Sequence, residues 1–173
     1  MNSKLRQLIP SKINDRFSKA EIFVGYNADD TLIQITYLVD KKTFEQLSGK
    51  ISTLNQCHQR KDQLWSGNCL EYFIKVLDST AYIEFNFSLN GEWNAFCFPS
   101  YRQGKTEALG IKLKTFERTI NEKFVEFSIT LDSSLQVTLG EGHGTAILFD
   151  GTTPNYFNTL GDLAAEPDFH LFP

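Results

Sequence analysis

The stretch that decides the fold runs from Leu64 to Gly104 and reads LWSGNCLEYFIKVLDSTAYIEFNFSLNGEWNAFCFPSYRQG. Apolar and polar side chains alternate through its centre, residues 81–88, which predicts a β-strand with one face directed at a core. The apolar set is Ala81, Ile83, Phe85 and Phe87, and the polar set is Tyr82, Glu84, Asn86 and Ser88. A strand therefore carries a carboxylate and an amide on the face away from the core.

Two more strands flank this one, over residues 69–77 and 92–98. The turn signal at 78–80 and the Asn90-Gly91 pair predict two hairpins in succession, the second with a type I′ turn, in which both central residues have positive φ. This three-stranded meander is expected to bring Glu71 of the first strand to the same surface as Glu84 and Asn86.

Aromatic side chains accompany this polar row. Trp93 and Tyr101 lie beside the row as rings on which a ligand could stack. For Trp93 the alternative is a place in the core, which is natural if it shares a face with Ala95 and Cys97. Trp65 precedes the first strand in a loop-like context and is the better wall for a pocket. Rings to stack on and acceptors that orient hydroxyl groups are what a small polar ligand requires.

The rest of the chain continues the same pattern. Strands are predicted at intervals near ten residues, over 21–27, 32–39, 110–119, 123–131, 135–139, 145–149 and 155–160, with Gly140, Gly142 and Gly144 in a loop. Residues 100–108 read as a polar loop. In the segment 40–63, residues 43–47 form either a helical turn or a short edge strand, and 51–54 form a possible strand. We expect an all-β protein, a single antiparallel β-sandwich of about ten strands, in one domain over 20–173 after an extended or loosely attached lead-in over 1–19.

Composition narrows the class of protein. The chain has 173 residues, 41% of them apolar, with 15 Phe and 6 Tyr that favour strands. A net charge of −4 argues against nucleic acid and anionic membranes as partners. The N-terminal residues lack a signal-peptide pattern, so a cytoplasmic location is expected. Three cysteines, Cys57, Cys69 and Cys97, are an odd number and read as buried thiols, although a Cys69–Cys97 disulfide in an exported protein is an alternative.

Catalytic and metal sites are not indicated. His58, His143 and His170 are far apart and no C-x-x-C occurs, which argues against zinc. Asp29, Asp30 and Asp62 are explained better as solvated turn acids than as calcium ligands. Glu71 and Glu84 could reach the separation that a glycosidase needs, yet two such acids also bind sugar hydroxyls without reaction, or pair with Arg102 in a structural ion pair.

Several short motifs together resemble a known family. They are Leu64-Trp65, Cys69 with Glu71 and Phe73, the run 84–88, Gly91 before Trp93, Tyr101-Arg102 with Gly104, and the run 167–170. The chain from about Ala20 to its end resembles the DOMON-like family, which is similar to the family 9 carbohydrate-binding modules. The resemblance implies a β-sandwich with a ligand site on one sheet, for sugar or for haem, and implies that the 101–102 loop and the 168–170 tail lie at that site.

Haem is the less favoured ligand, because Met1 is the only methionine and His170 is the only histidine within these motifs. We therefore predict a non-catalytic module without a cofactor that binds carbohydrate or a similar polyol, with Arg102 neutralising one of the glutamates. The predicted site residues are Trp65, Glu71, Glu84, Asn86, Tyr101, Arg102 and His170. The alternatives are a protein-interaction module with residues 40–63 at its rim, and a structural Glu–Arg network that holds two sheets in register.

Overall fold

A computed structural model describes residues 4–12, 15–29, 31–48, 58–160, 168–170 and 172 of the chain. These residues contain eleven strands and three short helices. The strands are β1 (Arg6–Lys12), β2 (Ile22–Ala28), β3 (Leu32–Asp40), β4 (Cys69–Val76), β5 (Tyr82–Ser88), β6 (Trp93–Phe98), β7 (Thr106–Glu107), β8 (Ile111–Ile120), β9 (Phe124–Ser133), β10 (Leu139–Asp150) and β11 (Thr153–Asn158). The helices are η1 (Asp15–Phe17), α1 (Lys41–Ser48) and η2 (Leu64–Ser66). None of these helices is long and apolar enough to cross a membrane.

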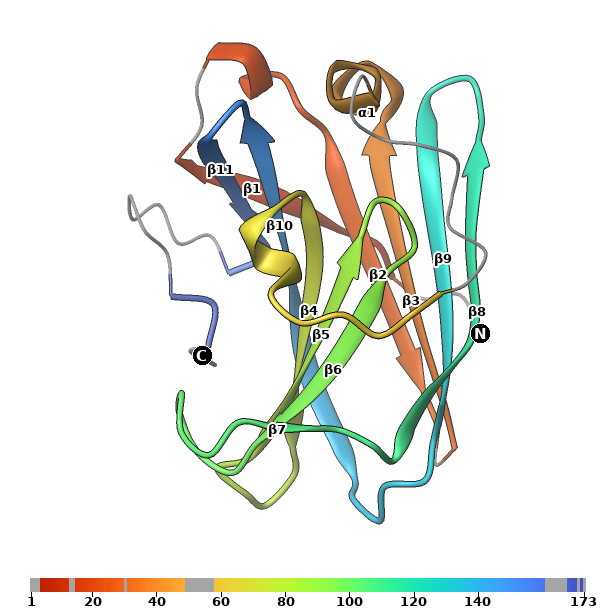
Figure 1. Cartoon of the computed structure of the whole chain (residues 1–173), viewed down its shortest axis with the longest axis vertical. Coiled ribbons are helices and arrows are strands. Elements are labelled where there is room, and N and C mark those ends of the chain that lie inside the picture. Colours follow the sequence, from red (N-terminus) through yellow and green to blue (C-terminus); the bar gives the residue numbers. More distant parts are fainter. Residues whose placement is uncertain are drawn as a thin grey trace.

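All strand pairings between these elements are antiparallel, in the order β7-β6-β5-β4-β10-β11-β1-β2-β3-β9-β8. β1 pairs with β11 through its second half and with β2 through its first half, so it joins the two halves of the order. The sheet curls into a half-barrel (Figure 1). The prediction of an all-β antiparallel fold is confirmed. The predicted sandwich of two sheets is not confirmed, because the strands follow one continuous hydrogen-bonded order.

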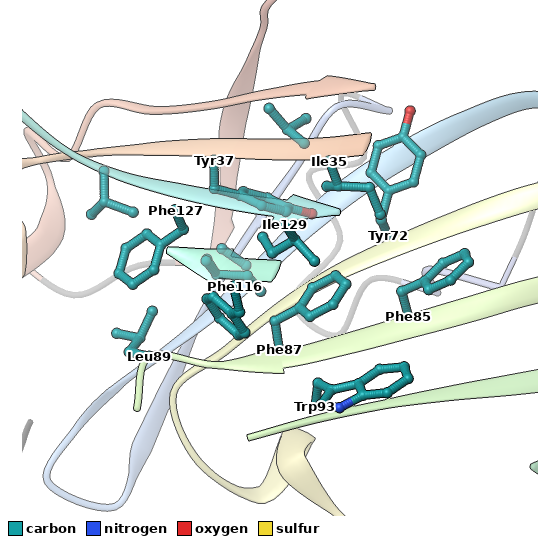
Figure 2. Close-up of a cluster of buried hydrophobic side chains, with 14 of the residues drawn as sticks. Ile35, Tyr37, Tyr72, Phe85, Phe87, Leu89, Trp93, Phe116, Phe127 and Ile129 are labelled. Atoms are coloured by element: carbon teal, nitrogen blue, oxygen red, sulfur yellow. The ribbon is translucent and has the colours of Figure 1, made fainter. Parts of the chain in front are cut away.

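The core fills the space inside the curl. Figure 2 shows Phe85 and Phe87 of β5 facing Phe116 of β8 and Phe127 of β9, and all four rings are buried. The hydroxyl of Tyr37 on β3 donates a hydrogen bond to a main-chain carbonyl of β4, which ties the two halves together. The predicted inward face of β5 is therefore confirmed, and Trp93 lies in the same core, as its strand pattern indicated.

The N-terminal segment departs from the prediction. Arg6–Lys12 is an inner strand with a partner on each side, so the interpretation of 1–19 as a loosely attached lead-in is wrong for these residues. Only main-chain pairing reveals β1, because its sequence, RQLIPSK, lacks a regular alternation and contains Pro10.

The glycines at 140, 142 and 144 lie within β10, where a loop was predicted. A Cβ on Gly142 would lie 2.6 Å from the carbonyl oxygen of Phe73 and from the ring of Tyr72. Glycine is therefore required by close packing against β4, not by a turn. The predicted strand over 135–139 is wrong except for Leu139, and the predicted strand over 145–149 is the second half of β10.

Two smaller differences concern the Asn90-Gly91 turn and residues 100–108, whereas the helical alternative for residues 43–47 is confirmed. Gly91 has a φ of 96° but Asn90 has no positive φ, so the hairpin forms without the predicted type I′ turn. Residues 100–108, predicted as a loop, contain the short strand β7, and residues 43–47 belong to α1. The possible strand at 51–54, together with Asp30, Cys57 and Pro167, lies outside the described residues. Cys69 and Cys97 are free thiols, so the alternative disulfide between them is wrong.

Candidate functional site

The outer face of the sheet, opposite the core, carries a second group of buried side chains. The alternation of β4 and β5 puts Glu71, Phe73, Glu84 and Asn86 on this face, because Phe85 and its apolar neighbours point inward. The strand register sets Glu71 opposite Asn86 on β5 and opposite Thr145 on β10. Both faces of β5 are therefore buried, and its outward polar row lies under other residues instead of in water.

A cavity of about 430 Å³ lies over this row. Its floor contains the carboxyl groups of Glu71 and Glu84, its walls are mainly aromatic, and its rim carries two basic side chains. The lining residues are Trp65, Glu71, Phe73, Glu84, Phe98, Arg102, Lys105, Ile147, Tyr156, Phe169 and His170. The volume falls within the range of sites for small ligands, roughly 300–1,000 Å³.

Each carboxyl group on the floor has one oxygen bonded to the protein. The hydroxyl of Thr145 donates to Oε2 of Glu71 over 3.0 Å, and Nδ2 of Asn86 donates to Oε1 of Glu84 over 2.6 Å. Asn86 also faces the thiol of Cys69, whose Sγ lies 3.7 Å from its Oδ1. Within the described residues the other two oxygens, Glu71 Oε1 and Glu84 Oε2, accept no hydrogen bond. They are free to accept one from a ligand.

Burial governs the protonation of this pair. The pKa of Glu71 is raised from 4.5 to about 8, mainly by desolvation and also by the charge of Glu84, while the hydrogen bond from Thr145 opposes the shift. Desolvation also raises the pKa of Glu84, against the stabilising effects of Asn86, Lys105 and Arg102. Without a ligand, the carboxyl group of Glu71 is therefore protonated at neutral pH.

The basic side chains at the rim pair with other acids. Arg102 Nη2 lies 3.1 Å from Asp168 Oδ1, and Lys105 Nζ lies 3.3 Å from Asp62 Oδ1. Lys105 also sits 4.3 Å above the ring of Trp65. The predicted ion pair between Arg102 and one of the glutamates is therefore wrong: the guanidinium pairs with Asp168 of the C-terminal tail and acts on Glu84 only from a distance, where it lowers the pKa.

The tail residues Phe169 and His170 form one wall of the cavity. A hydrogen bond of 2.6 Å joins the hydroxyl of Tyr82 and Nδ1 of His170, and Nε2 of His143 donates to the carbonyl of Phe169 over 2.6 Å. Burial lowers the pKa of both histidines to about 4, with Arg102 adding to the effect on His170. Both imidazoles are neutral at physiological pH, so His170 supplies no positive charge to Glu84, whose Oε2 is 4.0 Å away.

The structure brings five of the seven predicted residues to one cavity, namely Trp65, Glu71, Glu84, Arg102 and His170. Asn86 lies beside Glu84 and orients it, without lining the cavity. Tyr101 is exposed and donates its hydroxyl hydrogen to Asp168, which holds the tail beside Arg102.

Six lining residues were not predicted: Phe73, Phe98, Lys105, Ile147, Tyr156 and Phe169. Phe73 and Phe98 could have been found, because alternation puts them on the face of Glu71 and Glu84. Lys105 carries no such signal, since it stands in a polar loop. The described residues contain no cluster of three or more His, Cys, Asp or Glu side chains suited to a metal ion.

Comparison with known proteins finds solved structures of similar fold and no relative by sequence. No family model matches the sequence, and no curated protein matches it, so membership of the DOMON-like family stays a prediction. A solved structure of a candidate carbohydrate-binding protein from Bacteroides uniformis shares the fold, with a TM-score of 0.62 at 14% identity over 98% of this chain and 82% of that one. A family 9 carbohydrate-binding module from Caldicellulosiruptor kristjanssonii was solved with cellotriose and with glucose. The cellotriose complex aligns with a TM-score of 0.49 at 11% identity over 91% and 72% of the two chains, and the glucose complex with 0.45 at 10% over 89% and 74%.

Proposed function

We propose that the protein is a non-catalytic carbohydrate-binding module whose ligand occupies the cavity over β4 and β5. The observation that carries this proposal is the pair of carboxylate oxygens, on Glu71 and Glu84, that face the cavity without a hydrogen bond from the described residues. Buried acceptors of this kind are costly unless something bonds to them. Sugar hydroxyls are suitable donors, and hydrogen bonds to a carboxylate are among the stronger ones.

The aromatic walls of the cavity suit the apolar C–H surface of a sugar ring. The rings of Trp65, Phe73 and Phe98 line the cavity, and the C–H faces of a pyranose pack against aromatic rings. Trp65 is half-buried and lies edge-on to Phe96, with their ring centroids 6.2 Å apart, so its orientation is fixed before a ligand arrives. A pre-ordered wall reduces the entropy lost on binding.

The arrangement of the two acids favours binding over hydrolysis. Glycosidases flank the scissile bond with an acid and a second carboxylate that act from different sides. Glu71 and Glu84 instead project from neighbouring strands of one sheet surface and would meet the same side of a ligand. The fold shared with a candidate carbohydrate-binding protein is compatible with this proposal, although a fold alone does not define a function.

Tryptophan fluorescence provides the test. Of the two tryptophans, Trp65 lines the cavity and Trp93 lies in the core. A panel of neutral, acidic and basic mono- and oligosaccharides is titrated against wild type and against Trp65→Phe. We expect at least one sugar to change the wild-type emission and to leave the variant's emission unchanged.

Calorimetry with the same sugar then locates the site. Binding should weaken in Glu84→Gln and remain unchanged in Glu122→Gln, a control that removes an exposed acid from the β8–β9 turn. A sugar that binds Glu84→Gln as tightly as wild type would place the site outside this cavity. Absence of binding by every sugar in the panel would refute the proposed function.

A further inference from the structure

The charge of the cavity floor is not balanced by the protein around it. Glu71 and Glu84 are 4% and 6% exposed, and within the described residues the only basic side chain within 4.0 Å of either carboxylate is the neutral His170. Two carboxyl groups that share a desolvated surface without a cation are electrostatically unfavourable when both are ionised.

The nearby cations are already engaged. Arg102 is held by Asp168 of the tail, and Lys105 is held by Asp62 and by the faces of Trp65 and Phe96. Each rim cation thus has an acid of its own and forms no ion pair with the floor, although both cations act on Glu84 from a distance and lower its pKa. Tyr82 and His143, which contact the tail residues at the cavity wall, are neutral at pH 7.

Without a ligand, a proton on Glu71 takes the place of a cation and removes one of the two negative charges. The raised pKa of Glu71 means that this carboxyl holds a proton near pH 7. A hydroxyl of a neutral sugar could hydrogen-bond to that neutral acid but could not replace the proton. A ligand that brings its own positive charge would let both carboxyl groups ionise, and each would then gain a charge-assisted hydrogen bond.

We propose that the ligand is a sugar with a free, protonated amino group, and that its ammonium group lies between the carboxylates of Glu71 and Glu84. This inference rests on the proposed function and narrows it to one class of sugar. An ammonium group has three donors, enough for Glu71 Oε1, Glu84 Oε2 and one further acceptor. The aromatic walls are compatible with a cation, because the ammonium group of Lys105 already lies 4.3 Å from the ring centroid of Trp65.

The same geometry selects against two related classes. An acidic sugar would place a third carboxylate beside two others, and an N-acetylated sugar would present a neutral amide where the floor requires a positive charge. Discrimination by an unpaired buried charge is stronger than discrimination by a lost apolar contact.

Isothermal titration calorimetry at pH 6 tests the inference with D-glucosamine, D-glucose and N-acetyl-D-glucosamine as probes. At this pH the amine of the ligand and Glu71 are both protonated, so binding of the ammonium group should release about one proton, measured from the dependence of the heat on buffer ionisation. We expect glucosamine to bind at least about tenfold more tightly than the two neutral sugars, as for a charged hydrogen bond compared with a neutral one.

Variants assign the effect to the two acids. Glu71→Gln and Glu84→Gln should each lower the affinity for glucosamine about tenfold or more and change the affinity for glucose much less. Glu122→Gln is the control for loss of one distant charge. Because Gln retains the size of Glu and the hydrogen bonds from Thr145 or Asn86, both variants should fold, which a thermal unfolding scan verifies.

The outcomes separate the two proposals. If glucose or another neutral sugar binds as tightly as glucosamine, or if glucosamine binds without releasing a proton, the amine inference is wrong and the carbohydrate-binding function stands. If neither glucosamine nor any other sugar binds, both are wrong. A preference for glucosamine that persists in Glu71→Gln and Glu84→Gln would place the amine elsewhere and would also overturn the inference.

Discussion

Replacing Glu71 with glutamine should change how the stability of the fold depends on pH. The carboxyl group of Glu71 is buried on β4, with its pKa raised from 4.5 to about 8. The folded state therefore binds this proton more tightly than the unfolded chain does. The stabilisation from the proton is complete below pH 4.5 and is lost as the pH rises toward 8.

The size of the effect follows from the shift. With a value of 4.5 in the unfolded chain and about 8 in the folded protein, the free energy of unfolding should fall by about 3–4 kcal/mol between pH 5 and pH 8 on account of this group. His143 acts in the opposite sense, because its lowered pKa of about 4 makes the protein more stable as the pH rises toward 6.5. The histidine contributes equally to wild type and variant, so it cancels in their difference.

The assay is urea denaturation of wild type and Glu71→Gln at intervals from pH 5 to pH 8, followed by tryptophan fluorescence. The variant should gain about 3–4 kcal/mol relative to wild type across this range, whatever the offset between them at pH 5. Curves that run parallel over the whole range would show that Glu71 is ionised in the folded protein, and the argument about its burial would be wrong. Glu122→Gln should run parallel to wild type.

Three further predictions concern the packing that holds the site. Phe85→Ala should cost about 3–5 kcal/mol in chemical denaturation because its ring is fully buried in the core, and a loss below about 1 kcal/mol would contradict the assigned face of β5. Tyr37→Phe should cost about 1–2 kcal/mol by removing the buried hydrogen bond to β4, whereas Tyr101→Phe, at an exposed position, should change stability by less than about 0.5 kcal/mol; equal effects would argue against that bond. Gly142→Ala should cost about 1–3 kcal/mol because the new Cβ would meet the main chain of β4 at 2.6 Å, while Gly67→Ala, whose nearest neighbour is at 3.8 Å, should be close to neutral; a neutral Gly142→Ala would show that β10 can move away.

The sequence predicts the fold correctly where one face of a strand is apolar and the other is polar. Residues 81–88 show this alternation, and the structure has β5 there with Phe85 and Phe87 inside. Prediction failed where main-chain pairing or close packing decides the structure. Arg6–Lys12 joins the sheet through its main chain, and Gly142 of β10 is explained only by Tyr72 and the main chain of Phe73 on β4, which lie against it.

The candidate site could be predicted from the sequence only in part, again where strand periodicity decides which face a side chain is on. Strand periodicity put Glu71 and Glu84 on one surface, and the tail motif drew attention to His170. The partner of Arg102 was predicted wrongly because an ion pair depends on which acid a loop can reach, and the 168–170 tail folds back to place Asp168 beside it. Lys105 was missed because its position over Trp65 and Phe96 depends on the path of a loop that has no periodic pattern.

The cost of the site is itself an argument for its purpose. The outer face of β4 and β5 is apolar enough around Phe73, Phe96 and Phe98 to form a second hydrophobic cluster. Apolar side chains in place of Glu71 and Glu84 would extend that cluster and remove two desolvated carboxyl groups, and replacements of this kind are often neutral or stabilising. A surface that keeps two acids under such conditions, supports each with one neutral hydrogen bond and leaves the other oxygen facing a cavity has the properties of a binding site more than of a structural network. A structural network would have paired Arg102 with the floor, whereas this arginine instead holds the tail that forms the cavity wall.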